Sequence, residues 1–458
     1  MRIRNLRWWL CGLMFAATGL SFLDRQVLSV VAPLLTAEFG MSNAQYSYVT
    51  TGFLASYAIM FFLAGRMMDV VGTRVGMALS VGLWSVASAL HATAHSALQL
   101  GVFRFVLGAG EGGAFPGVTK GAAEWFPPRQ RALAIGIAIG GAALGAVVAP
   151  PMTVWIVKHM GWRGAFLSTG IIGAVWVTLW WVFYYAPAES PFVTDEELDL
   201  IQPPPATNQP AAGKARPSRM HPVSALAPTQ PIDYGRPETP PASLLSLLCR
   251  REVLGLAATR FLVDPVFYLY MFWIPKYLAQ ERGLSLALIG RLTWIPFFAL
   301  GISNILGGWV SDGLISAGVP AGKARKSVMA AAAALTVASG AAAHAGSATA
   351  AIGLMALLMF AHGFWITNFV TLISETFPKS SVATVMGLTG MVGAIGGMLA
   401  NTAIGYVADR YSFTPIWIAS GCMYPLALVV LLLTVRPGIP LAKQFFPVDE
   451  ASPLEEAQ

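Results

Sequence analysis

The chain has 458 residues, of which 56% are hydrophobic and only 11% are charged. Soluble globular proteins carry about 25% charged residues. This chain therefore has too few charges to cover a surface that faces water, and most of its surface must face lipid. The composition excludes a soluble enzyme, and the net charge of +7 does not indicate a nucleic-acid partner, because the basic residues gather in particular loops.

A helix needs about 20 mostly apolar residues to span the hydrocarbon core of a bilayer. The sequence predicts an all-α membrane protein with about twelve transmembrane helices in two six-helix halves. The predicted spans lie at residues 7–32, 44–67, 74–93, 97–122, 130–157, 163–185, 253–280, 286–312, 326–345, 349–376, 382–408 and 414–436.

The distribution of basic residues predicts the orientation of these spans. Three arginines precede the first span, and no signal-peptide cleavage site follows them. Further Lys and Arg residues fall mostly in alternate loops, as cytoplasmic loops require. We therefore expect both termini to be cytoplasmic. The residues concerned are Arg2, Arg4, Arg7, Arg66, Arg74, Lys120, Arg129, Arg131, Lys323, Arg325 and Lys326.

A proline-rich stretch separates the two halves. Thirteen prolines fall between Pro187 and Pro241, a composition that cannot form a packed core and is typical of a linker. Within it, Thr194 and Glu197 have the spacing of a capping box and predict one short amphipathic helix. The expected division is an N-terminal half at 1–185, a cytoplasmic linker at 186–245, a C-terminal half at 246–437 and a cytoplasmic tail at 438–458.

The same glycine-to-aspartate spacing follows the second and the eighth span, which indicates that the two halves are a parallel repeat. Each glycine would let helix ends approach closely, and each aspartate could bind an arginine or a helix N-terminus and close the cytoplasmic side. The alternative is an ordinary turn with a solvated acid. The predicted cytoplasmic gate consists of Gly65, Asp69, Gly72 and Arg74 in the first half and Asp312, four residues after Gly308, in the second.

Ionisable residues inside spans are informative, because each costs about 2.5–3.5 kcal/mol at the centre of a helix. Arginine donors suit a carboxylate ligand, and a carboxylate that gains and loses a proton can couple transport to protons. The alternative is that these groups form structural ion pairs. The candidates are Asp24 and Arg25 in the first span, Arg104 and Glu111 on one face of the fourth, and the possible charge pair Arg260 and Asp264 in the seventh.

Three further polar or aromatic residues at membrane depth, Tyr57, Trp365 and Asn368, could line a cavity or fill the core. The chain contains no nucleophile–base arrangement, metal-ligand spacing or phosphate-binding loop. We therefore expect neither an enzyme nor a cofactor or metal site. A membrane sensor without transport activity is a further alternative; it would need an output domain, and the linker is too proline-rich to be one.

Taken together, these residues and segments resemble those of a known family. The chain is similar over nearly its whole length to the major facilitator superfamily, to the anion:cation symporters within it, and to hexuronate transporters among those. The resemblance rests on the loop motif Gly65, Asp69, Gly72 and Arg74, on the segments Phe22–Pro33, Glu124–Pro127, Gly161–Arg163, Arg260–Pro265 and Phe272–Pro275, and on His362, Trp365, Asn368, Thr371, Ser374 and Glu375.

The resemblance implies proton-coupled uptake of a small organic anion, most closely a hexuronate such as galacturonate or glucuronate, by alternating access. Relatives with these motifs also carry aldonates, aldarates, tartrates or aromatic acids, so another carboxylate remains the alternative. It further implies a monomer in the bacterial inner membrane. Arg25 and Arg104 would hold the substrate carboxylate and Asp24 and Glu111 would handle protons, while the other cavity residues would be Tyr57, Trp365 and Asn368.

Overall fold

The computed structural model describes residues 2–201, 244–377 and 379–435, and within these the chain is helical without any strand. The first half contains α1 (Leu6–Glu38), α2 (Asn43–His91), α3 (Ala97–Glu111), α4 (Ala114–Trp125) and α5 (Pro128–Phe183). The short η1 (Pro187–Glu189), α6 (Asp195–Ile201) and α7 (Leu244–Leu248) follow. The second half contains α8 (Arg251–Gln280), α9 (Leu286–Leu292), α10 (Trp294–Ser316), α11 (Ala321–Thr336), η2 (Val337–His344), α12 (Ala348–Thr376), α13 (Lys379–Arg410) and α14 (Thr414–Thr434).

Two of these helices consist of two arms each. Gly72 interrupts α2 with φ 81°, and Gly161 interrupts α5 with φ 70°. Glycine adopts such positive φ values without steric cost. The first half therefore has six transverse segments: α1, the two arms of α2, α3 with α4, and the two arms of α5. The second half has six as well: α8, α9 with α10, α11 with η2, α12, α13 and α14. Twelve segments confirm the predicted number.

Nine helical stretches of the described residues are long and apolar enough to cross a membrane. One of them, Leu133–Phe183, includes Gly161 and so holds two segments. The first arm of α2 and the α3–α4 pair are not among the nine. α3 and α4 are separate helices of 15 and 12 residues, and this pair carries Arg104 and Glu111.

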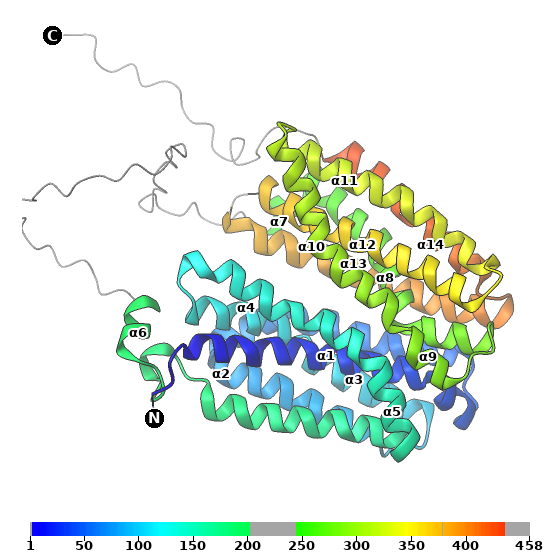
Figure 1. The fold of residues 1–458 in the computed structure, drawn as a ribbon, viewed down its shortest axis with the longest axis horizontal. Helices are drawn as coiled ribbons and strands as arrows, with labels where there is room; N and C mark the ends of the chain where they lie inside the picture. Colours follow the sequence, from blue (N-terminus) through cyan, green and yellow to red (C-terminus); the bar gives the residue numbers. More distant parts are fainter. Residues whose placement is uncertain (1, 202–243, 378, 436–458) are drawn as a thin grey trace, which may run out of the picture.

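The helices of each half pack closely on one another. In the first half, α1 and α5 approach at Gly141 and Gly145, where an added β-carbon would overlap the carbonyl oxygens of Phe15 and Gly19. Small residues allow such close contact between membrane helices. Figure 1 shows the helices of the first half in the lower part and those of the second half in the upper part. The N-terminus, α6 and α7 lie on the left, and we call this side the terminal end and the opposite side the far end.

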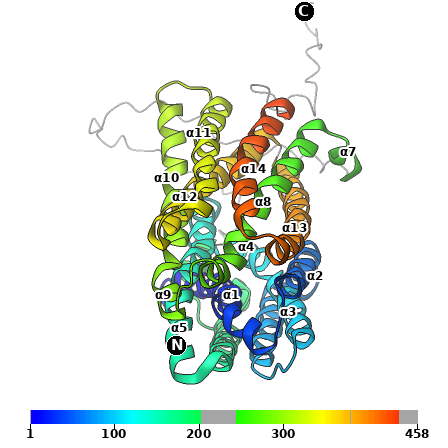
Figure 2. The same cartoon turned by 90° about the vertical axis from the view of Figure 1, so that its right-hand side faces the viewer.

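Contacts between the halves gather at the far end, which faces the viewer in Figure 2. There α2 packs against α13, and α5 packs against α9 and α10. The hydroxyl of Tyr46 in α2 donates to the carbonyl oxygen of Phe272 in α8 at 2.9 Å. Hydrogen bonds from Asn43, Ala44 and Asn401 add to this interface. The described structure is thus closed at the far end.

Part of the predicted linker is described. The short helix expected near Thr194 is confirmed as α6, and the amide of Glu197 donates to the Thr194 hydroxyl at 3.3 Å. The second half of the expected capping box is wrong, because the Glu197 carboxylate turns instead to α1. There it accepts from the amides of Leu6 and Arg7 at 2.9 and 3.1 Å and from the Arg7 guanidinium at 2.9 Å. Residues 202–243 of the linker and the predicted tail lie outside the described residues.

Candidate functional site

An arginine and a glutamate from two helices form a buried pair near the middle of the first half. Nε of Arg25 in α1 donates to Oε2 of Glu111 in α3 at 2.6 Å, and the two side chains are 4% and 0% exposed. Arg25 lies well inside α1 (Leu6–Glu38), away from either end. Two buried charges are stable only when they compensate each other. The charge of Arg25 therefore stabilises the ionised carboxylate of Glu111, and that carboxylate stabilises the buried charge of Arg25.

Arg104 lies beside this pair without touching a carboxylate. Its guanidinium donates to the backbone carbonyl oxygens of Asp24 at 3.2 Å and Arg25 at 3.1 Å. It also lies 4.9 Å from the centre of the Phe53 ring. Arg104 is fully buried. In this conformation it supports the backbone of α1 where Arg25 projects, and its predicted contact with a substrate remains a prediction.

Asp24 points to a different part of the first half. Its Oδ1 accepts from the Ser88 hydroxyl at 2.7 Å, and Ser88 in turn lies 2.7 Å from the Thr169 hydroxyl. These partners belong to the second arms of α2 and α5. The two predicted proton sites are therefore separate: Glu111 pairs with an arginine, and Asp24 accepts from hydroxyl groups.

Residues of both halves surround a small cavity of about 100 Å³. Tyr57 and Phe61 of α2 line it from one side, and Arg260 and Tyr268 of α8 line it from the other, together with residues of α13. The guanidinium of Arg25 lies over the Tyr57 ring at 4.5 Å from its centre. Tyr57 thus connects the buried Arg25–Glu111 pair to a cavity between the halves, and its contact with a substrate remains a prediction.

Trp365 and Asn368, predicted to face the cavity, are buried within the second half. Trp365 packs edge-on against Tyr424 at 5.5 Å. The amide nitrogen of Asn368 donates to the carbonyl oxygens of Gly307 at 3.1 Å and Phe364 at 2.8 Å, and so connects α12 with α10. Neither residue belongs to the described lining of the cavity. Their substrate contacts would require another conformation of the transport cycle.

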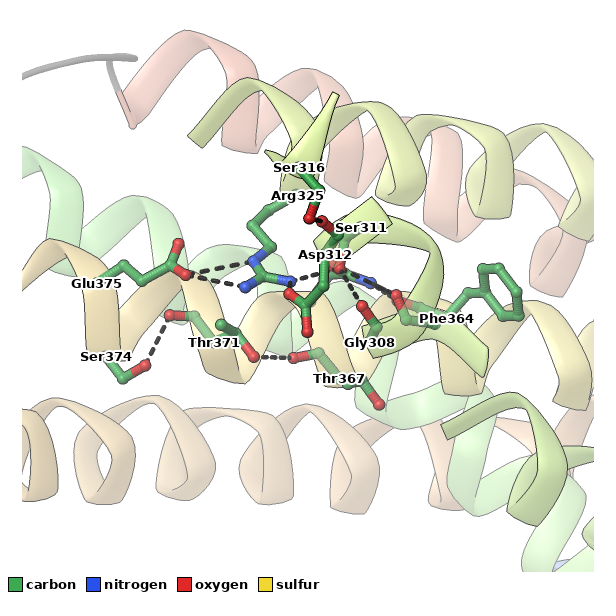
Figure 3. Close-up of polar contacts among 12 residues, drawn as sticks. Gly308, Ser311, Asp312, Ser316, Arg325, Phe364, Thr367, Thr371, Ser374 and Glu375 are labelled. Carbon is green, nitrogen blue, oxygen red and sulfur yellow. Dashed lines mark hydrogen bonds and ion pairs between the residues drawn. The ribbon is translucent and has the colours of Figure 1, made fainter. Parts of the chain in front are cut away.

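The predicted gate residue Asp312 takes part in a charge cluster at the terminal end, drawn in Figure 3. Arg325 at the start of α11 donates to Asp312 of α10 at 2.8 Å and to Glu375 of α12 at 3.0 Å, and it also contacts the Ser311 hydroxyl. All three helices belong to the second half. In this conformation the cluster joins helices of one half, so its predicted role as a gate remains a prediction.

Gly308 is not the point of close helix approach that the repeat predicted. A β-carbon added at Gly308 would meet only an ordinary contact with Thr367 at 3.7 Å. One added at Gly307 would lie 2.9 Å from the Cα of Phe364. The close approach of α10 and α12 therefore falls one residue earlier than the spacing indicated.

The copy of the motif in the first half is described only in part. Gly72 marks the turn between the two arms of α2. Arg74 donates to the carbonyl oxygen of Trp181 at 2.6 Å and stacks on the Tyr185 ring at 3.7 Å, which fastens α2 to the end of α5. Gly65 and the side chain of Asp69 lie outside what the structure describes.

The polar interface at the far end was missed by sequence reasoning. Asn401 of α13 accepts from the indole of Trp273 at 2.7 Å and lies within hydrogen-bond distance of three oxygens of α2. Asp409 accepts from the amides of Asn43 and Ala44 at 2.8 Å each, at the start of α2. The signal available in the sequence was an asparagine inside an apolar span, because such residues seldom lack a partner.

This interface also holds a buried cation. The ammonium group of Lys276 lies over the rings of Tyr46 at 4.6 Å and Trp273 at 5.5 Å. It has no hydrogen-bond partner in the described part of the chain. Across the same residues, no group of three or more His, Cys, Asp or Glu side chains could hold a metal ion.

Two six-helix halves, a cavity between them and charges at membrane depth are the geometry of a secondary transporter. The sequence profile of the Major Facilitator Superfamily matches residues 14–401. The chain belongs to this superfamily. Membership explains the parallel repeat, and it makes the chain a multi-pass membrane transporter rather than an enzyme.

Individual members agree with this assignment. The hexuronate transporter of Escherichia coli strain K12 is 31% identical over 447 residues, which cover 97% of this chain and 98% of that one. The galacturonate transporter of Dickeya chrysanthemi is 32% identical over 68% of this chain and 82% of its own length. A crystal structure of a bacterial homologue of the human lysosomal transporter Spinster, described as inward-facing and unoccupied, superposes with a TM-score of 0.67 at 19% identity, covering 98% of this chain and 100% of that one. This last likeness concerns the fold alone.

Proposed function

We propose that this superfamily member takes up a hexuronate, such as galacturonate or glucuronate, together with protons and by alternating access. The observation that carries the proposal is the buried Arg25–Glu111 pair beside Tyr57 at the cavity between the halves. It is supported by relatives named hexuronate and galacturonate transporter that match most of the chain. An arginine fork suits a substrate carboxylate, and a neighbouring acid suits a proton.

The pair couples the two ligands by competition. While Glu111 is ionised, it neutralises Arg25 and occupies its Nε. Protonation of Glu111 leaves the charge of Arg25 uncompensated at a buried site, which is unfavourable until an anion arrives. A carboxylate therefore binds best when a proton is already bound. After both have left, the pair forms again and the empty carrier can return without an isolated buried charge.

Asp24 would serve as a second proton site, since it accepts from Ser88 and lies apart from the Arg25–Glu111 pair. A monoanion that enters with one proton carries no net charge across the membrane. With a second proton the transported charge is positive, and the membrane potential then contributes about 2.3 kcal/mol per 100 mV. Two intramembrane acids permit this stoichiometry.

Uptake of labelled galacturonate and glucuronate into liposomes that contain the purified protein tests the proposal. With one proton per anion, an inward gradient of one pH unit supplies about 1.4 kcal/mol, enough for about tenfold accumulation. We expect accumulation only with the gradient. Failure of the folded protein to take up either acid would sink the hexuronate proposal and favour another carboxylate.

Two variants assign the roles of the residues. Glu111→Gln keeps a hydrogen-bonding group but cannot exchange a proton, so counterflow of substrate should persist while gradient-driven accumulation falls to equilibrium. Arg104→Ala should abolish substrate binding, because the donors that support α1 at Arg25 are lost. Accumulation by Glu111→Gln at the wild-type level would exclude Glu111 as an obligatory coupling site.

We further propose that the protein is a monomer of the bacterial inner membrane with the terminal end on the cytoplasmic side. The cationic residues near the terminal end, including Arg74 and Arg325, support this orientation. Cys249, which is exposed beside α7, gives a direct test. A membrane-impermeant maleimide should label it in inverted vesicles and not in right-side-out ones, in a Cys422→Ser background. The opposite pattern would reverse the topology.

A further inference from the structure

A second arginine–carboxylate pair lies on the other half of the cavity. Nε of Arg260 donates to both carboxylate oxygens of Asp264 at 3.0 and 2.9 Å, and its Nη2 lies 2.8 Å from Oδ2. Arg260 lines the same cavity as Tyr57 of the first half, and the guanidinium of Arg25 lies over the Tyr57 ring. The Asp264 side chain is only 8% exposed and does not belong to the described lining. It lies behind Arg260.

The position of the Asp264 carboxylate depends on one glycine of α13. A β-carbon added at Gly393 would overlap Oδ2 of Asp264. Gly387 and Gly390 of the same helix have nothing within 4 Å of such a β-carbon. The helix therefore leaves space for a carboxylate at Gly393 in particular, and Asp264 fills that space. This packing holds the carboxylate against Arg260 and keeps the guanidinium neutralised.

From this geometry we infer that Asp264 limits the substrate to a single anionic group. It does so by occupying Arg260, the cation that could otherwise bind a second carboxylate at the other end of the ligand. The inference rests on the proposed function, in which Arg25 takes the first carboxylate. A hexuronate has one carboxylate, whereas an aldarate of the same length has one at each end. The second carboxylate would meet an Arg260 whose Nε and Nη2 already face Asp264, and it would be repelled by that acid.

Competition against labelled galacturonate in liposomes tests the inference. In the wild type, unlabelled galactarate should compete at least about tenfold more weakly than unlabelled galacturonate, as like charges at close range are strongly unfavourable. Asp264→Asn keeps the shape and one acceptor oxygen for Arg260 but removes the negative charge. Galacturonate uptake should continue in this variant, and competition by galactarate should strengthen about tenfold. A residue that only positions Arg260 would not change the selectivity in this way.

Gly393→Ala tests the inference independently, because the alanine methyl group displaces the Asp264 carboxylate without removing it. It should shift selectivity toward galactarate, while Gly387→Ala, which meets open space in the same helix, should behave as the wild type. Elution of each variant as a single species in size-exclusion chromatography confirms that it is folded.

The outcomes separate this inference from the function on which it rests. If the wild type takes up galacturonate and galactarate competes equally well, Asp264 does not exclude a second anion, and the inference is overturned without any variant. Unchanged discrimination in folded Asp264→Asn overturns it too. Absence of galacturonate uptake in the wild type would instead refute the proposed function, and the inference with it.

Discussion

Replacement of Asn401 with alanine tests whether the interface at the far end holds the two halves in the closed arrangement. The Asn401 amide nitrogen lies 3.0 Å from the Ser47 carbonyl oxygen, 2.6 Å from the Thr50 hydroxyl and 2.9 Å from the Thr51 hydroxyl. All three oxygens belong to α2, on the other half. An amide group has two N–H donors, so at most two of these contacts are full hydrogen bonds at one time.

The magnitude follows from these two bonds. Each neutral hydrogen bond contributes about 1 kcal/mol net, so the substitution should destabilise the arrangement closed at the far end by about 2 kcal/mol relative to one in which the halves have separated there. The indole of Trp273 also loses its acceptor. Trp273 and Asn401 lie in the same half, so this loss affects both arrangements equally and cancels. A difference of about 2 kcal/mol changes the population ratio about 30-fold.

Spin labels at Leu98 and Tyr411 report the separation, since both side chains are exposed near the far end of opposite halves. The exposed Cys249 and Cys422 are first replaced with serine. Electron–electron distance measurements should show a longer-distance population in Asn401→Ala. Asn304→Ala is the matched control, because Asn304 contacts Thr367 within its own half. Identical distance distributions in the two variants would refute the reasoning.

Three further substitutions probe the fold. Gly161→Ala should lower the melting temperature of the detergent-purified protein, because alanine at φ 70° and ψ 176° costs about 1–3 kcal/mol. Gly136→Ala, in a helix with open space around it, should not lower it, and equal losses in both would refute the conformational argument. Glu197→Gln should speed hydrogen exchange at the start of α1 about tenfold, as a charged hydrogen bond is worth about 1.5–3 kcal/mol; unchanged exchange would mean that the acid does not cap the helix. Arg325→Met should lower the free energy of unfolding by about 1–3 kcal/mol, since the side chain is 9% exposed but its partner Glu375 is 33% exposed. A thermal shift below one degree would show that the cluster contributes nothing.

Much of the architecture follows from local patterns in the sequence. The apolar stretches place nearly all transverse segments, and the turns at Gly72 and Gly161 fall between predicted spans. Figure 3 illustrates the limit of such patterns. The spacing predicts a gate at Asp312, and in this conformation Arg325 joins this residue to Glu375 within the same half. Spacing along the chain does not report which neighbouring helix a side chain faces.

The candidate site also shows which features the sequence predicts and which it does not. The sequence placed Arg104 and Glu111 seven residues apart on one helix face. The structure instead pairs Glu111 with Arg25, 86 residues away in the sequence, and directs Arg104 to backbone carbonyls of α1. Asp24, adjacent to Arg25, points elsewhere, because successive residues of a helix project about 100° apart.

The sequence by itself therefore determined that the chain is a two-half membrane bundle with arginines and acids at membrane depth. Hydropathy and residue type are properties of short segments, and they survive any arrangement of the helices. Only the tertiary structure decided which charges compensate each other, that Tyr57 and Arg260 meet at one cavity, and that Asp264 fills the space left by Gly393. These relations depend on the rotation and packing of helices distant in the sequence, which no local pattern encodes.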